Sequence, residues 1–277
     1  MSLGIAFKGP EGIVLAADSR VTLTAQLQQP GGQPNMLLPS TYDNATKLLR
    51  VKGQDHVGAV TYGAGAIGQT EPRTAHSYIP ELEQELGKEG VGRLSVEDFA
   101  NRLSQFFLTK WQAQNMPTVQ GQDMIFLVGG YDEGAPYGRV FDAFIPSRPT
   151  PVEWHGGAGQ FGLVWGGQRE YADRLVTGFD GNLPELAKGF LGLDDQKRDE
   201  LRKHLQERLQ APVPFAFLPL QDCVDLAIFL IRTTIIMQRW IIGVRGVGGA
   251  IDVAVITQTD GFVDVQKKKV TGEGLGP

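Results

Sequence analysis

The chain has 277 residues, 42% of them hydrophobic, and a net charge of −5 with acidic and basic residues interspersed. This balance gives no electrostatic support for binding to nucleic acid or to an anionic membrane. Cys223 is the only cysteine, which excludes an internal disulfide and a cysteine-based metal cluster and fits a reducing, cytoplasmic setting. The four histidines show no ligand spacing, so we expect neither a metal nor another cofactor.

Two short apolar segments at the start of the chain predict a β-hairpin. They span residues 3–7 and 13–17, and the Lys-Gly-Pro-Glu-Gly segment between them favours a turn. The start lacks the charged and then apolar pattern of a signal peptide. The hydroxyl residue Ser2 therefore directly precedes the first strand, unless Met1, Ser2 and Leu3 are an added leader.

The next hundred residues predict a loop, two strands and two helices. Residues 21–46 are polar and rich in Gln, Pro and Gly, so we expect an extended loop there. Strands are expected at 47–51 and 57–62, before the small-residue segment Gly63-Ala64-Gly65. Apolar residues at helical spacing then predict helices over 77–86 and 96–114.

The second half of the chain predicts an antiparallel meander, several helices and a closing hairpin. We expect strands at 124–128, 139–144, 152–154 and 163–165, helices at 168–179, 183–210 and 220–240, and a hairpin at 251–257 and 262–267 with an Asp-Gly turn. Charges at Asp225, Arg232 and Arg239 argue against a membrane span in the most apolar helix. With no repeat or linker, we expect one α+β domain over residues 1–277, with a helical excursion at about 183–217.

Residues 12–20, Gly-Ile-Val-Leu-Ala-Ala-Asp-Ser-Arg, resemble a segment of the proteasome-type β subunits. In that family a stretch of this form follows an N-terminal catalytic Thr, and Ser2 stands at the corresponding position. The resemblance is strongest at residues 4–20, 46–68 and 248–266. It implies the four-layer αββα sandwich of the N-terminal-nucleophile hydrolases.

The resemblance assigns roles to nine residues. Ser2 would be the nucleophile once Met1 is removed, and its own α-amine, which titrates near ~7.7–8.0, would be the base. Asp18 and Lys47 match the family's acid–lysine pair, and Gly63 matches the glycine whose N–H stabilises the oxyanion. The primary substrate pocket would be mostly apolar and suited to a medium apolar or neutral side chain; its walls would be Val21, Ala45, Leu49, Thr61 and Gly65.

Each catalytic candidate also has a plain structural interpretation. Asp18 would suit a turn, Lys47 a surface position, and Gly63 a turn with positive φ. What favours the catalytic interpretation is that all of them occur together and in the family's order.

Two features depart from the family pattern. Asp18 and Lys47 are separated by 29 residues, roughly twice the family's spacing, so residues 21–46 contain an insertion near the mouth of the site. Gly167, Val244 and Val247 stand where the family has polar groups that support the N-terminal amine. These departures place the chain nearer to the divergent bacterial group called Anbu, the ancestral β subunit.

The expected function is that of a proteasome-like peptidase that cleaves polypeptides within a homo-oligomer, either a closed ring or an open assembly. The resemblance leaves open whether an ATP-dependent unfoldase feeds it. We expect the helices at 77–86 and 96–114 to form subunit contacts, since the second has more apolar surface than one sheet face needs: Phe99, Leu103, Phe106, Phe107 and Trp111. Two alternatives stand beside this expectation, a catalytically silent ring subunit and an amidohydrolase acting on a small amide.

Overall fold

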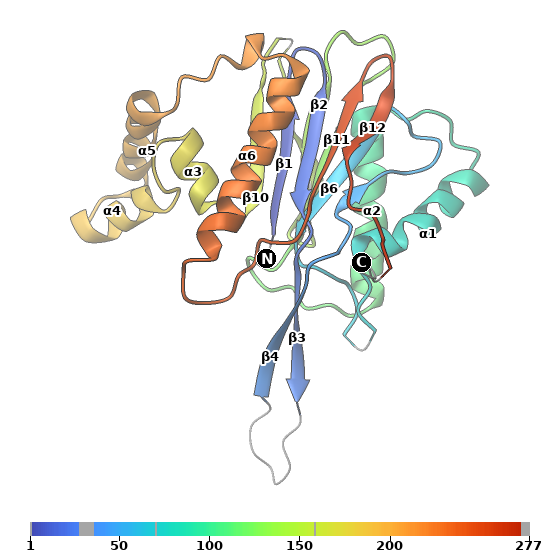
Figure 1. The fold of residues 1–277 in the computed structure, drawn as a ribbon, viewed down its shortest axis with the longest axis horizontal. Helices are drawn as coiled ribbons and strands as arrows, with labels where there is room; N and C mark the ends of the chain where they lie inside the picture. Colours follow the sequence, from blue (N-terminus) through green and yellow to red (C-terminus); the bar gives the residue numbers. More distant parts are fainter. Residues whose placement is uncertain (1, 28–35, 70, 158, 273–277) are drawn as a thin grey trace, which may run out of the picture.

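The computed structural model describes residues 2–27, 36–69, 71–157 and 159–272 (Figure 1). Two five-stranded antiparallel sheets form its centre. The first contains, in spatial order, β10 (Gly162–Gly167), β1 (Leu3–Lys8), β2 (Ile13–Asp18), β11 (Ile251–Thr257) and β12 (Gly261–Gln266). The second contains β5 (Leu48–Leu49), β6 (Val57–Gly63), β7 (Met124–Gly130), β8 (Arg139–Ile145) and β9 (Arg148–Trp154).

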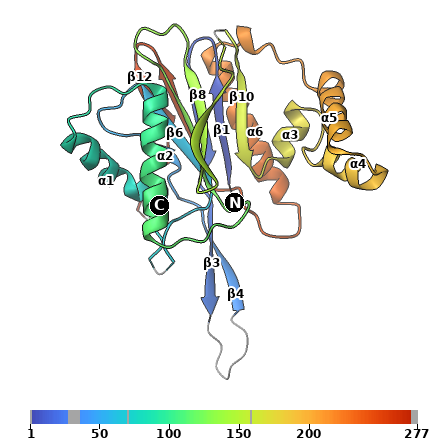
Figure 2. The same cartoon turned by 180° about the vertical axis from the view of Figure 1, so that it is seen from behind.

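Three buried clusters show how helices and sheets pack. The first joins the second sheet to α1 (Ala75–Lys88) and α2 (Val96–Ala113). Another joins the first sheet to α3 (Glu170–Val176) and α6 (Leu220–Gln238), which lie on the opposite side of the molecule (Figures 1 and 2). The third contains residues of both sheets, among them Ile13 and Leu127. This mixture of helices and antiparallel sheets confirms the α+β prediction.

The apolar surface of α2 is absorbed within the chain. Phe107 is fully buried, and its ring centroid lies 4.6 Å from that of Phe126 on β7. The other apolar residues that we expected to contact a neighbouring subunit are at most 5% exposed; they are Phe99, Leu103, Phe106 and Trp111. The expectation of spare apolar surface was therefore wrong, because both α1 and the second sheet pack against this helix.

Residues 21–46 are not the extended loop that we expected. They include two paired antiparallel strands, β3 (Val21–Leu27) and β4 (Met36–Tyr42), and residues 28–35 lie outside the described part of the chain. The alternation Val-Thr-Leu-Thr at 21–24 favours a strand, and the polar composition of the segment concealed it. The ribbon projects from the end of the first sheet at which β1 begins (Figure 1).

Two more expectations need correction. β10 is not part of the meander but pairs with β1 in the other sheet, where Leu163 and Trp165 pack toward the helices and Val164 packs between the sheets. The single helix expected at 183–210 is divided into α4 (Leu183–Leu191) and α5 (Asp195–Leu209), since Gly192 ends α4 in a left-handed conformation.

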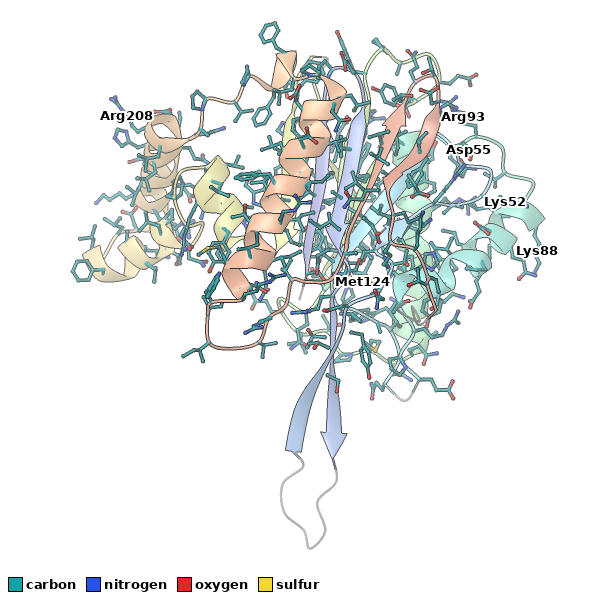
Figure 3. All side chains as sticks on the ribbon, viewed as in Figure 1. Lys52, Asp55, Lys88, Arg93, Met124 and Arg208 are labelled. Carbon is teal, nitrogen blue, oxygen red and sulfur yellow. The ribbon has the colours of Figure 1, made fainter. Side chains whose placement is uncertain are left out.

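The remaining expectations were close. The strand predicted at 47–51 is only two residues long, and a short 3-10 helix (Phe215–Phe217) precedes α6. Side chains of α5, including Arg208, lie at the edge of the molecule opposite Lys88 of α1 (Figure 3). Within the described residues, no helix combines the length and apolar character needed to cross a bilayer.

Candidate active site

A single buried carboxylate connects the start of β1 with Lys47. Asp18 ends β2 and is 1% exposed. Its Oδ1 accepts hydrogen bonds from the Leu3 backbone N–H at 3.0 Å and from Lys47 Nζ at 2.6 Å. Its Oδ2 accepts from the backbone N–H groups of Arg20 at 3.1 Å and Gly248 at 3.0 Å. Four donors thus fix one carboxylate directly behind the first strand.

Lys47 is held as a buried cation. The residue is 6% exposed, and burial lowers the pKa of its ammonium group, while the charge of Asp18 acts in the opposite direction. Its backbone carbonyl accepts a hydrogen bond from the Thr61 N–H at 3.0 Å, which anchors Lys47 beside β6. The ammonium group is therefore a compact charge in a fixed position.

Ser2 lines a narrow cavity that brings together most of the residues predicted for the site. The cavity volume is about 20 Å³, enough for roughly one water molecule. Among the described residues, seven of the nine predicted ones line it: Ser2, Val21, Ala45, Lys47, Thr61, Gly63 and Gly65. Residues that the resemblance assigned to one site are thus close together in space.

Two predicted residues lie elsewhere. Asp18 stands behind Lys47, to which it is bonded, rather than in the cavity wall. Leu49 is fully buried in the cluster that faces α1 and α2, whereas its neighbour Leu48 faces the space between the sheets. Because successive side chains of a strand point to opposite faces, Leu49 is directed away from the cavity.

Ser2 also lines a second, larger cavity. Its volume is about 550 Å³, and its lining includes Ser2, Gly63, Met116, Asp123 and Gln168. Met124, which is paired with Gly63 across β6 and β7, lies near the end of the sheets from which the ribbon projects (Figure 3). Ser2 is therefore placed where two cavities meet.

The backbone at Gly63 requires glycine. Its φ is +86°, and a Cβ there would stand 2.1 Å from the carbonyl oxygen of Asp123. The same carbonyl accepts a hydrogen bond from the Ala64 N–H at 2.8 Å, which fixes the turn after β6. A side chain at position 63 would displace this turn from the cavity wall.

Two glutamines near Ser2 were not predicted from the sequence as parts of the site. The backbone N–H of Gln168 donates to the Ser2 carbonyl at 2.8 Å. Gln238, on α6, is 1% exposed; its Nε2 donates to Gln168 Oε1, and its Oε1 accepts from the Val247 N–H at 3.0 Å. The available signal was a glutamine one turn after Thr234 and two turns after Ile231, within the buried stripe of an apolar helix.

The positions without the family's polar groups are now located. Gly167 approaches Ser2 so closely that a Cβ would stand 1.9 Å from the Ser2 carbonyl oxygen. Val247 is buried against α6, and Val244 is 46% exposed.

Among solved structures, this arrangement of sheets and helices has a counterpart that covers nearly the whole chain. The alignment with an Anbu mutant from Hyphomicrobium sp. strain MC1 covers 97% of this chain and 86% of that one, with a TM-score of 0.53 and 15% identity. The fold is similar to that of Anbu. No family model and no curated protein matches the sequence. At this identity the similarity to Anbu concerns the fold, and it confirms the resemblance to proteasome-like β subunits at that level.

Replacing Asp18 by Asn should strongly destabilise the protein. The NH2 group of Asn would face a donor where the carboxylate accepts a hydrogen bond, and Lys47 would be buried without a counter-charge. Together these effects should lower the free energy of unfolding by about 3–5 kcal/mol. Asp55→Asn is the matched control, because its carboxylate is 58% exposed and pairs with Arg50 at the surface, where about 1 kcal/mol or less is expected. Urea denaturation measures both, and equal losses would contradict the proposed importance of the buried carboxylate.

Proposed function

We propose that the chain is a proteasome-like N-terminal-nucleophile peptidase that uses Ser2, exposed by removal of Met1, to cleave polypeptides. The observation that carries this proposal is the Asp18 carboxylate, which binds both the start of β1 and Lys47 beside the cavity that Ser2 lines. We further propose that the two sheets and their covering helices form the four-layer αββα sandwich of that superfamily, as one domain.

In the proposed reaction, the α-amine of Ser2 takes the proton from Oγ while Oγ attacks the substrate carbonyl carbon. The resulting tetrahedral oxyanion is stabilised by the N–H of Gly63. When the C–N bond breaks, the ammonium group returns the proton to the leaving amine and an ester remains on Ser2. Attack by water on this ester, with the amine again acting as base, releases the acid and regenerates the hydroxyl.

Lys47 contributes its charge to this reaction. A buried ammonium group close to Ser2 favours the ionised form of the hydroxyl and the neutral form of the α-amine. Asp18 keeps the lysine in place, and burial limits the reorganisation of solvent around it.

The two cavities beside Ser2 suit an extended substrate. The narrow cavity would accept a small apolar side chain without movement of its walls. This side chain is smaller than the medium-sized one expected from the sequence. The larger cavity offers space for further residues of the same polypeptide. A peptide that lies across Ser2 would thus contact both.

We also propose a homo-oligomer, on a basis different from the sequence expectation. Large apolar side chains are exposed on α4 and just after α6; Phe190 is 89% exposed and Trp240 is 81% exposed. Apolar surface of this kind commonly marks a subunit contact.

Acylation by an electrophilic peptide tests the nucleophile. Mass spectrometry of the mature wild-type protein should show loss of Met1 and one adduct on Ser2, and Ser2→Ala should show no adduct, since the attacking oxygen is gone. Ser2→Thr should retain the reaction because its extra methyl group restricts χ1. Labelling of Ser2→Ala at the wild-type rate would contradict the assignment, and an unreactive wild type would favour a catalytically silent subunit.

Replacing Lys47 by Arg should slow acylation by about 100- to 1,000-fold, because the wider guanidinium group cannot occupy the same buried position as a compact charge. Lys52→Arg is the matched control, since Lys52 is exposed and should react at the wild-type rate. Rates of adduct formation compare the three proteins. A rate for Lys47→Arg within threefold of wild type would exclude this role of the lysine.

Native mass spectrometry should find a particle of several subunits. Phe190→Asp combined with Trp240→Asp should shift the mass distribution toward the monomer, because each substitution places a charge in apolar contact surface. Val270→Asp, at a fully exposed position outside the helices, should leave the distribution unchanged. A monomeric wild type at micromolar concentration would refute the proposed assembly.

A further inference from the structure

The lining of the larger cavity includes a buried hydrogen-bond donor that has no partner. Trp111 lies on α2, is 3% exposed and lines this cavity, whose volume is about 550 Å³. Its indole Nε1 is buried and makes no hydrogen bond within the described part of the chain. An indole N–H can only donate, and buried polar groups are nearly always paired. The cavity offers the space in which an acceptor for this N–H can lie.

Two comparisons show that this donor is unusual. The indole Nε1 of Trp165 donates to the buried carboxylate of Asp173 at 2.8 Å, which is the ordinary arrangement for a tryptophan in a protein interior. The hydroxyl of Thr22, on β3, also lines the larger cavity and is also buried without a partner among the described residues. Unpaired polar groups thus reach one cavity from two separate elements, which points to a ligand.

The charge of the lining restricts the chemistry of that ligand. Among the described residues that line the cavity, Asp123 has the only charged side chain. It is 8% exposed, and its Oδ1 accepts a hydrogen bond from the Ser147 backbone N–H at 3.0 Å. A second carboxylate in the cavity would be repelled by it, and an apolar group would leave the Trp111 N–H unpaired. The partner that fits is a neutral oxygen acceptor.

We infer that the larger cavity is a subsite for an amide side chain of the substrate, glutamine or asparagine, and that Trp111 donates its indole N–H to the carbonyl oxygen of that side chain. The inference rests on the proposed function, since it names a substrate class for the same site. The NH2 group of such a side chain also finds acceptors in the lining, namely the Thr22 hydroxyl and the Asp123 carboxylate.

Burial of the donor makes this subsite selective. The indole N–H is covered in this structure, so an incoming side chain must displace part of the cavity wall to reach it. Met116, which lines the same cavity, has the flexible side chain that such a movement needs. A side chain that accepts a hydrogen bond offsets the cost of the movement, whereas an apolar side chain of the same length does not. A site of this kind discriminates against analogues that lack the hydrogen-bonding group.

Electrophilic peptides that differ in one residue test the inference. Alanine next to the electrophile fits the narrow cavity, and glutamine, methionine or glutamate follows at the second or third position. At the better of these positions, the glutamine peptide should acylate wild-type Ser2 about 10-fold faster than the methionine peptide, compared as second-order rate constants. In Trp111→Phe this ratio should fall below about twofold. Trp154→Phe is the matched control, since Trp154 is 43% exposed, lines neither cavity and should keep the wild-type ratio.

Ratios measured within one variant cancel a general loss of stability or reactivity. The preference for the glutamine peptide over the glutamate peptide should fall in Asp123→Asn, because Asn removes the repelling charge while its oxygen can still accept from Ser147. Equal rates for the glutamine and methionine peptides in wild type would overturn the inference and leave the peptidase proposal standing. A glutamine preference that persists in Trp111→Phe would also overturn it.

A readout without catalysis separates this inference from the proposed function. The chain has four tryptophans, so 15N-labelled indole groups give a simple spectrum in which Trp111→Phe identifies one resonance. In mature Ser2→Ala protein, the glutamine peptide should shift the Trp111 resonance, the methionine peptide should shift it less, and Trp165, already bonded to Asp173, should not respond. Equal shifts with both peptides, or no shift, would overturn the inference. A selective shift in a protein whose wild-type Ser2 is never acylated would retain the subsite and refute the peptidase.

Discussion

The burial of one carboxylate is the constraint on which the rest of the candidate site depends. Asp18 is almost completely removed from water, so each of its oxygens needs partners within the protein. The partners are the backbone N–H at the start of β1, the Lys47 ammonium group, the Arg20 backbone N–H and a backbone N–H in the segment before β11. Segments that are more than two hundred residues apart in the sequence are therefore joined at one side chain.

This constraint connects the ribbon to the site. Arg20 donates its backbone N–H to Asp18, while its guanidinium group binds both carboxylate oxygens of Asp43, at 2.6 and 2.7 Å, and the Arg245 carbonyl at 3.2 Å. Asp43 follows β4 directly, and Val21 at the start of β3 lines the narrow cavity. The ribbon that projects from the molecule (Figure 1) is thus fixed at its base by Arg20, which also donates a hydrogen bond to the buried Asp18 carboxylate. A two-stranded ribbon alone is marginally stable in water, so this attachment matters for keeping Val21 in the cavity wall.

The sequence was informative where one local pattern decides the structure. The β1–β2 hairpin could be predicted because Gly9, Pro10 and Gly12 force the turn, and α2 because its apolar residues recur at helical spacing. The proximity of Ser2, Lys47 and Gly63 followed from the resemblance, and the structure brings these residues to one cavity. Their chemical roles stay predictions.

The sequence was uninformative where partners from distant segments decide. The face to which Leu49 points depends on a strand of only two residues, too short to show alternation. Whether the aromatic residues of α2 are buried within the chain depends on α1 and the second sheet together. No local pattern in the sequence indicated a role for Gln238, although a neutral amide in a buried stripe also needs partners. Its partners are Gln168, which follows β10, and Val247, which lies in the segment before β11. No single stretch of sequence contains all three residues.

The hydrogen bonds from Val247 to Gln238 and from Gln238 to Gln168 all run in one direction, and this direction follows from burial rather than from charge. In the family pattern as matched to this sequence, polar side chains occupy the positions of Gly167, Val244 and Val247; here the backbone N–H of Val247 takes part instead. A backbone donor cannot reverse, whereas a hydroxyl can both donate and accept. Two glutamines in series transmit this fixed direction from the segment before β11 to Gln168, whose backbone N–H donates to the Ser2 carbonyl. A buried network built from amides thus specifies which end donates, and it does so with no titrating group in the chain of bonds.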